Sequence, residues 1–153
     1  MYCFMLTKND KNIGTLIHLS AFFSFIFPFG SVIGPLIMWV ISKDKSDYLN
    51  RNGVEAINFN LSYTLYIFIL GLLMFPFAFG AFFNNIRNME SFDDYHFNLH
   101  FNVDNFFGLF SVGSLIGIIA FVRFLLIIVA AIKANRGEVY NYPLAINFMK
   151  DKN

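Results

Sequence analysis

The sequence has little charge and a single cysteine. Lysine and arginine number 11 and aspartate and glutamate 10, so charged residues make up 14% of the chain, against about a quarter in soluble domains. The formal net charge of +1 gives no indication of nucleic acid binding, which needs a clustered basic face. Cys3, without a second cysteine, excludes an internal disulfide and a metal site built from cysteines.

Most of the remaining residues are apolar. The chain is 57% hydrophobic and 20% aromatic, and 22 of its 153 residues are phenylalanine. The length allows one domain only, and a soluble domain of that size hides much less apolar surface. The composition therefore predicts an all-α integral membrane protein, a helical bundle whose solvent is the lipid bilayer.

The polar stretch Lys43 to Asn60 divides the chain, and the hydrophobic part before it is broken. Residues 13–42 follow a short N-terminus, residues 1–12, that ends in charged residues, and contain two prolines and two glycines close together: Pro28, Gly30, Gly34 and Pro35. Proline breaks a straight helix, so residues 13–42 form either one kinked span or a hairpin of two short helices turning near Phe29. Length favours the single span, because crossing a bilayer takes about 20 helical residues and two short helices within residues 13–42 would not both reach that length.

The second part predicts two long transmembrane helices. We expect a cytoplasmic loop over 43–53, a helix over 54–83, an acidic extracytoplasmic loop over 84–105, a helix over 106–134 and a cytoplasmic tail over 135–153. Basic residues and Gly137 end the last helix, as is typical of helix C-termini. The tail contains Tyr140, Tyr142 and Pro143, and we expect it to run along the membrane surface.

The distribution of basic residues favours the hairpin for residues 13–42. Nine of the eleven lie in three groups: Lys8 and Lys11; Lys43, Lys45 and Arg51; Lys133, Arg136, Lys150 and Lys152. The positive-inside rule places such flanks in the cytoplasm. All three groups share that side only if residues 13–42 enter and return, so we predict the hairpin, with both termini cytoplasmic in a bacterial cytoplasmic membrane.

Four blocks of sequence resemble a known group. They are IHLSAFF, GPLIMWVISKD, VEAINFN and AIKANRGEVYNYPL, and together they resemble the small bacterial membrane proteins related to the chloroplast inner-envelope import component, the Tic-twenty-like group. The resemblance covers most of the chain, without the first ten residues and the acidic loop. It implies four helical segments with both termini cytoplasmic. Arg123 is not part of that pattern, and the family name itself does not indicate protein import.

Arg123 is the most informative candidate residue. An arginine inside a span costs at least about 2.5 kcal/mol unless it pairs or reaches water. Ten residues separate it from Lys133, which is roughly 15 Å along a helix axis. It either contacts an ion or substrate, or has a structural role as an intramembrane pair or as a docking point for a partner subunit. We favour the structural role, and we expect Glu55 as the internal acceptor with Asn58 as a bridge.

The other candidates have ordinary structural explanations. Glu55, Asn58 and Ser62 share one helix face and join helices or line a polar entrance, while His18 makes a hydrogen-bonded helix contact or titrates near neutral pH. Gly113 and Gly117 have the G-x-x-x-G spacing of close helix packing. His96 and His100 in the acidic loop lack the helix signals that metal binding at i, i+4 would need, so we predict no metal and no cofactor.

No catalytic motif appears in the sequence. We therefore predict a non-catalytic accessory or structural subunit of a larger membrane complex, with the lipid bilayer and a larger membrane protein, or copies of itself, as partners. The alternative is a channel or translocation component with a polar path near Arg123 and Glu55. A pore from this chain would need several copies, because few polar positions share a face.

Overall fold

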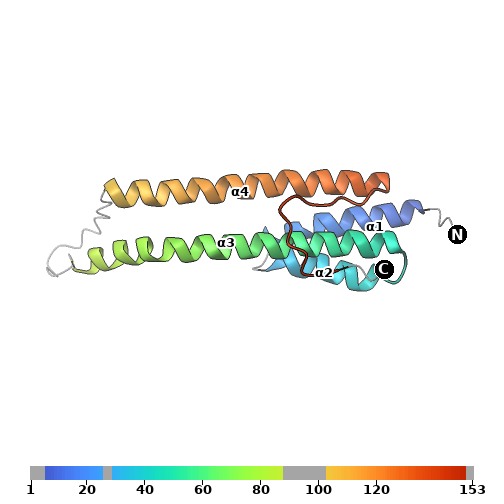
Figure 1. Cartoon of the computed structure of the whole chain (residues 1–153), viewed down its shortest axis with the longest axis horizontal. Helices are drawn as coiled ribbons and strands as arrows, with labels where there is room; N and C mark the ends of the chain where they lie inside the picture. The colour runs from blue at the N-terminus through green and yellow to red at the C-terminus, as the bar shows by residue number, and fades with distance from the viewer. Residues whose placement is uncertain (1–5, 26–28, 88–102, 151–153) are drawn as a thin grey trace. The chain divides into compact units, whose positions relative to one another are not determined.

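The structure, a computed structural model, describes residues 6–25, 29–87 and 103–150, and every regular element within these ranges is a helix (Figure 1). Its elements are α1 (Lys8–Leu19), the 3-10 helix η1 (Ser20–Phe25), α2 (Gly30–Ser42), α3 (Asp47–Arg87) and α4 (Val103–Arg136). Two compact units divide it, one of residues 1–65 with 122–153 and one of residues 66–121. The predicted all-α class, with a short broken hairpin and two long helices, is confirmed.

Residues 8–42 form the hairpin, and two glycines of α2 allow its arms to meet. A Cβ at Gly30 would lie 2.3 Å from the backbone oxygen of Phe23, and one at Gly34 would lie 2.3 Å from that of Ser20. Backbone meets backbone at both positions, which only glycine permits. Phe29, at the turn before α2, has a left-handed φ of 65°, and Pro28 lies outside the described residues.

The first helix begins at Lys8, five residues before the expected start. Thr7 caps it, because its hydroxyl oxygen accepts from the backbone N–H of Asp10 at 3.1 Å while its own N–H donates to the Asp10 carboxylate at 3.0 Å. Reciprocal bonds of this kind satisfy two donors that a helix start leaves open. The T-x-x-D pattern over residues 7–10 is a start signal that outweighs the polarity of the stretch.

The helix α3 also begins early, at Asp47, so the expected loop over 43–53 is wrong in its second half. The hydroxyl of Ser46 accepts from the backbone N–H of Leu49 at 3.2 Å, as an N-cap does. Asn50 accepts from the Trp39 indole N–H at 2.9 Å, and Asn52 donates to the backbone oxygen of Tyr48 at 2.9 Å. These bonds satisfy asparagines that would otherwise favour a loop.

The first unit has an apolar core in two clusters that join all its segments. One cluster is made of Ile17, Tyr48, Leu49 and Ala56. The other is made of Ala21, Phe59, Ile127, Ala130 and Tyr142. The second cluster includes the tail: Tyr142 is only 6% exposed and stacks on Phe59 with ring centroids 4.0 Å apart.

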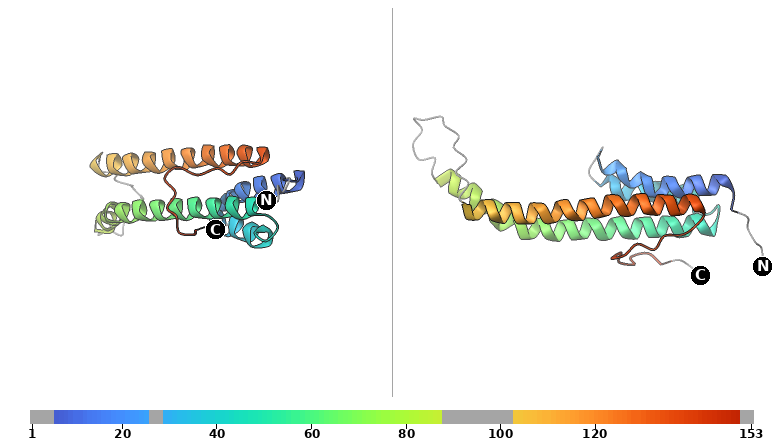
Figure 2. Two further views of the ribbon diagram at one scale, coloured as in Figure 1. Left: turned by 45° about the vertical axis from the view of Figure 1, so that its right-hand side comes forward. Right: turned by 90° about the horizontal axis from the view of Figure 1, so that it is seen from above.

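Gly137 directs the tail onto the bundle. Its φ of 88° ends α4, with Gly137 N bonded to Ala134 O at 2.9 Å and Glu138 N to Lys133 O at 3.0 Å. This pair of bonds is a Schellman motif, in which a left-handed residue reverses the chain. Figures 1 and 2 show the tail leaving the end of α4 and lying beside the first half of α3.

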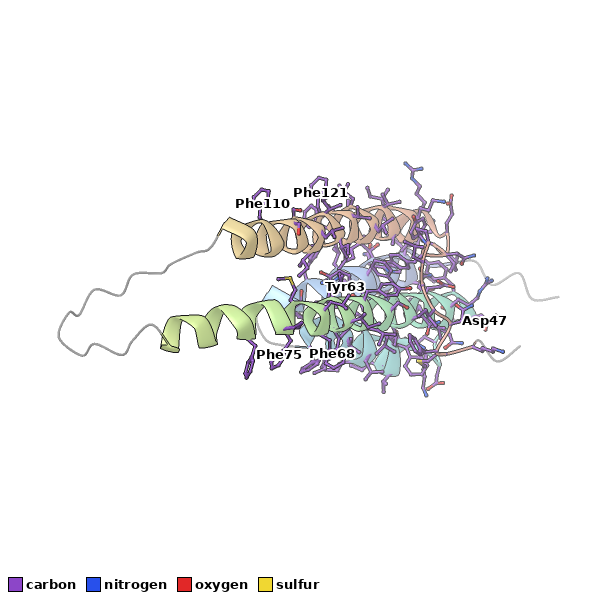
Figure 3. All side chains as sticks on the ribbon, turned by 60° about the vertical axis from the view of Figure 1, so that its left-hand side comes forward. Asp47, Tyr63, Phe68, Phe75, Phe110 and Phe121 are labelled. Atoms are coloured by element: carbon purple, nitrogen blue, oxygen red, sulfur yellow. The ribbon has the colours of Figure 1, made fainter. Side chains whose placement is uncertain are left out.

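The described part of the second unit is the end of α3 and the start of α4, and large apolar side chains are exposed on it. Phe68, Phe75, Phe110 and Phe121 are each more than 60% exposed, and their side chains extend outward in Figure 3. A Cβ at Gly71, Gly113 or Gly117 would meet nothing within 4 Å. Among the described residues, therefore, nothing packs into the G-x-x-x-G surface of α4.

Two segments of the described chain are long and apolar enough to cross a membrane, Asp47–Pro76 and Gly113–Arg136. Only 17% of the most apolar stretch of each is buried, which is low for the core helix of a soluble protein. α2 is apolar but shorter, with 13 residues. Of the expected loop over 84–105, residues 88–102 lie outside the described residues, and so do Cys3, His96 and His100.

Candidate functional site

A chain of buried hydrogen bonds connects α1, α3 and the tail. His18, with no exposed surface, bonds through Nε2 to Asn52 Oδ1 at 3.0 Å and through Nδ1 to the Tyr142 hydroxyl at 3.0 Å. The amide N–H of Asn52 donates to the backbone oxygen of Tyr48. The Tyr48 hydroxyl in turn donates to Ala134 O of α4. We call His18, Asn52, Tyr142 and Tyr48 the polar junction.

The donor and the acceptor of each hydrogen bond in the polar junction can be assigned. Asn52 uses its amide N–H on Tyr48 O, so its oxygen faces His18 and must accept from Nε2–H. The other ring nitrogen, Nδ1, then accepts from the Tyr142 hydroxyl, and a neutral imidazole satisfies every bond. Burial raises the pKa of Tyr142, so its hydroxyl keeps the proton that it donates to His18.

A second group of polar side chains fastens the tail to α3. Asn58 donates to Met149 O at 2.9 Å and accepts from Met149 N at 2.8 Å. Ser62 accepts from Ile146 N at 2.7 Å and donates to Asn58 O at 2.7 Å. We call these four residues the tail clamp. Asn58 and Ser62, expected on one helix face, thus bind backbone of the tail, and Asn58 makes no bridge to Arg123.

Arg123 has a different acceptor from the expected one. Its Nη2 donates to Asn60 Oδ1 at 2.9 Å, and its guanidinium carbon lies 4.2 Å from the ring centroid of Tyr63. Asn60 is five residues further along α3 than Glu55, about 7.5 Å deeper, which matches the depth of Arg123. The Nε atom of Arg123 is buried and has no hydrogen-bond partner, so the guanidinium is incompletely satisfied.

The candidate residues from the sequence thus lie in different parts of the structure and do not form one site. His18 lies in the polar junction, Asn58 and Ser62 in the tail clamp, and Arg123 on Asn60, while Gly113 and Gly117 lie on open helix surface. Glu55 is half-buried on α3. In the described ranges, no three His, Cys, Asp or Glu side chains come together as a metal site.

Several residues that build these groups gave no signal in the sequence. Tyr142 and Asn52 lie far from His18 in the chain, and Asn60 pairs with a residue 63 positions away. Gly30 and Gly34 have the same four-residue spacing as Gly113 and Gly117. Their place beside Pro28 and Pro35 suggested a turn, although the spacing itself was the signal for close packing.

A family model described as the magnetosome magnetite crystal formation protein family matches residues 9–149. No curated protein and no solved structure matches the chain. The expected kinship with relatives of the chloroplast import component is wrong, because the matched family is a different one. The blocks that suggested it are short and mostly apolar, a composition that unrelated membrane helices share.

Proposed function

We propose that this chain, which belongs to the magnetosome magnetite crystal formation protein family, is a non-catalytic accessory subunit of a larger membrane assembly. The family's description concerns the formation of magnetite crystals, and we take over that setting as part of the proposal. In this role the first unit is a rigid, internally fastened body. The apolar surface of the second unit packs against a partner within the bilayer.

The observation that carries this proposal is the use of the interior polar groups. Asn58 uses both its amide nitrogen and its amide oxygen in hydrogen bonds to the backbone of Met149, and Arg123 donates to Asn60. A polar path for an ion or a polypeptide would need side chains of this kind to face an opening. Their commitment to neighbouring segments supports structural fastening over the channel alternative.

The surface of the second unit supports the choice of a protein partner. Four exposed phenylalanines, Phe68, Phe75, Phe110 and Phe121, project from two helices, and the glycine positions of α4 between them are open. Open glycines allow another helix to approach closely, and lipid does not require them. Lipid tails cover phenylalanine and leucine equally well, so aromatic shape matters only to a partner that packs against it.

The proposed orientation makes the chain one multi-pass membrane domain with both termini cytoplasmic. The basic groups around Lys8, Lys43 and Lys133 support it through the positive-inside rule. Cys3 is the single native thiol, so a membrane-impermeant maleimide should label it in broken cells and leave it unlabelled in intact cells. Labelling in intact cells, with a known cytoplasmic cysteine protected, contradicts this orientation.

Assembly is tested by purification at native expression level in gentle detergent. We expect the tagged chain to migrate on native gels in a complex several times its own 17.6 kDa, with a second membrane protein identified by mass spectrometry. Replacing the four exposed phenylalanines by leucine should keep membrane insertion and reduce the complex severalfold, because hydrophobicity is retained while aromatic shape is lost.

The control places the same kind of change away from the proposed contact surface. Phe148→Leu, at an exposed position of the tail, should leave the complex intact. A chain that runs as a monomer with no retained partner contradicts the subunit proposal. A complex that contains only copies of this chain contradicts it too, and favours the oligomeric channel.

A further inference from the structure

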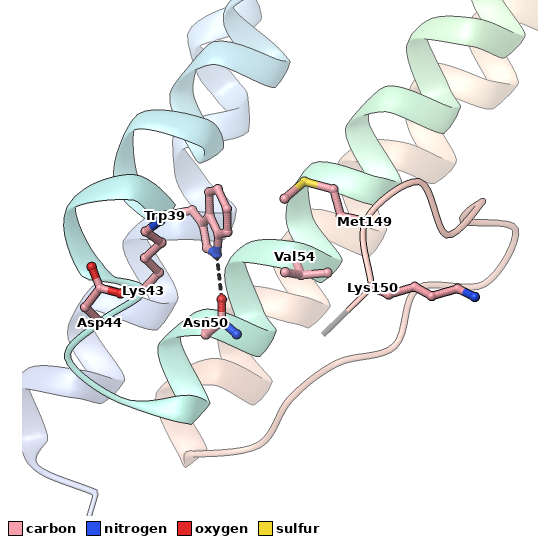
Figure 4. A pocket seen from close by; sticks show the side chains of 7 residues that line it. All are labelled: Trp39, Lys43, Asp44, Asn50, Val54, Met149 and Lys150. Atoms are coloured by element: carbon pink, nitrogen blue, oxygen red, sulfur yellow. Dashed lines mark hydrogen bonds between the residues drawn. The ribbon is translucent and has the colours of Figure 1, made fainter. Parts of the chain in front are cut away.

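A pocket of about 370 Å³ lies where α2, the start of α3 and the tail meet (Figure 4). All the residues that line it belong to the first unit: Trp39, Lys43, Asp44, Asn50, Val54, Met149 and Lys150. Neither the polar junction nor the tail clamp explains this mixture of an aromatic ring, two lysines and two apolar side chains. The volume is in the range of small-molecule binding sites.

Trp39 forms a fixed wall of the pocket. Its indole N–H donates to Asn50 Oδ1 at 2.9 Å (Figure 4), and its ring lies so close to Gly53 that a Cβ there would meet Trp39 Cδ1 at 2.1 Å. Lys43 Nζ lies 5.1 Å from the centre of the indole. The ring is held from two sides, so the ammonium of Lys43 has a defined place at the pocket.

The charges of the pocket sum to one positive unit. Lys43 and Lys150 contribute two positive charges and the exposed Asp44 one negative charge, which leaves a surplus that matches the single negative charge of a phosphodiester. In Figure 4 Lys43 extends from the end of α2 close to Trp39, and the Lys150 side chain extends from the tail, away from Trp39. The exposed side chain of Lys150 has the rotamer freedom to turn toward an anion in the pocket.

Two residues that line the pocket, Trp39 and Lys43, share a side of α2 with exposed apolar residues. Leu36, Trp39, Val40 and Lys43 have i, i+3, i+4, i+7 spacing, so they lie on one side of α2, and Leu36 and Val40 are 37% and 53% exposed. A strip of apolar side chains thus ends in a tryptophan and a lysine. Tryptophan and lysine anchor the ends of membrane segments at the headgroup level.

We infer that this pocket binds the phosphate headgroup of a phospholipid with one net negative charge. Lys43 and Lys150 pair with the phosphate, Trp39 packs against the glycerol region, and an acyl chain lies along Leu36 and Val40. The inference does not depend on the proposed function, because it concerns the end of α2 and not the surface of the second unit.

Trp39 is the only tryptophan, so its fluorescence reports on this site alone. We would reconstitute the full chain in phosphatidylcholine vesicles and add phosphatidylglycerol with brominated acyl chains, which quenches a nearby indole. Brominated phosphatidylcholine serves as the reference lipid. Half-maximal quenching should need about fivefold less phosphatidylglycerol than phosphatidylcholine per engaged lysine, from the usual strength of a lysine at an anionic surface.

Variants separate this site from general surface charge. Lys43→Gln should remove most of the preference, whereas Lys45→Gln, an exposed lysine two residues away that does not line the pocket, should keep it. Equal quenching by both lipids in the wild type, or equal losses in the two variants, overturns the inference. Displacement of the brominated lipid by millimolar inorganic phosphate also overturns it, because the site would then bind free phosphate.

Discussion

Replacement of Gly34 by alanine is expected to lower the free energy of unfolding by about 3 kcal/mol, the upper end of ordinary overpacking. The new Cβ would lie 2.3 Å from the backbone oxygen of Ser20. A flexible side chain could move aside, but this contact is with backbone, so η1 and α2 must separate. Thermal unfolding of the full chain in detergent, followed by Trp39 fluorescence, measures the loss.

Gly71→Ala is the matched control for this experiment. It makes the same chemical change inside a helix, at a position where an added Cβ meets nothing within 4 Å. Alanine is the better helix former by up to about 1 kcal/mol, so this variant should be as stable as the wild type or slightly more stable. A Gly34→Ala protein as stable as Gly71→Ala would disprove the close contact in the hairpin.

The second large effect is expected at Asn60. Asn60→Leu removes the acceptor of the Arg123 Nη2 donor and puts an apolar side chain beside a guanidinium whose Nε already lacks a partner. Leaving a buried donor without its acceptor costs about 1 to 3 kcal/mol, and more when the donor is charged. Arg123→Met, which takes away the charge itself, should cost less, and the double variant should recover most of the loss of Asn60→Leu.

A double-mutant cycle measures this coupling as the departure from additivity in unfolding free energy. We expect about 2 kcal/mol between Asn60→Leu and Arg123→Met, the size of one hydrogen bond to a charged group. Thr64→Val is the control, because the Thr64 hydroxyl donates to the backbone oxygen of Asn60 at 2.8 Å and so touches the same residue without the guanidinium. Additivity in the first cycle would exclude Asn60 as the acceptor.

Local sequence signals account for most of the helices, and they also explain where the predicted helix starts were wrong. Proline and glycine near Phe29, with basic residues on both flanks, were enough to predict the hairpin. The starts of α1 and α3 were predicted too late, because polar composition was given more weight than the capping residues Thr7 and Ser46. Capping depends on hydrogen bonds within one turn, so both starts were readable from the sequence.

The sequence by itself determined that the chain is helical, apolar on its outside and divided at Lys43 to Asn60, because these properties depend on composition and on neighbours within a few residues. Only the tertiary structure decided which polar groups pair. His18 meets Tyr142 across 124 residues and Arg123 meets Asn60 across 63. A buried donor bonds to the acceptor that lies level with it in the folded chain. Helix packing, together with the reversal of the tail at Gly137, decides which acceptor that is.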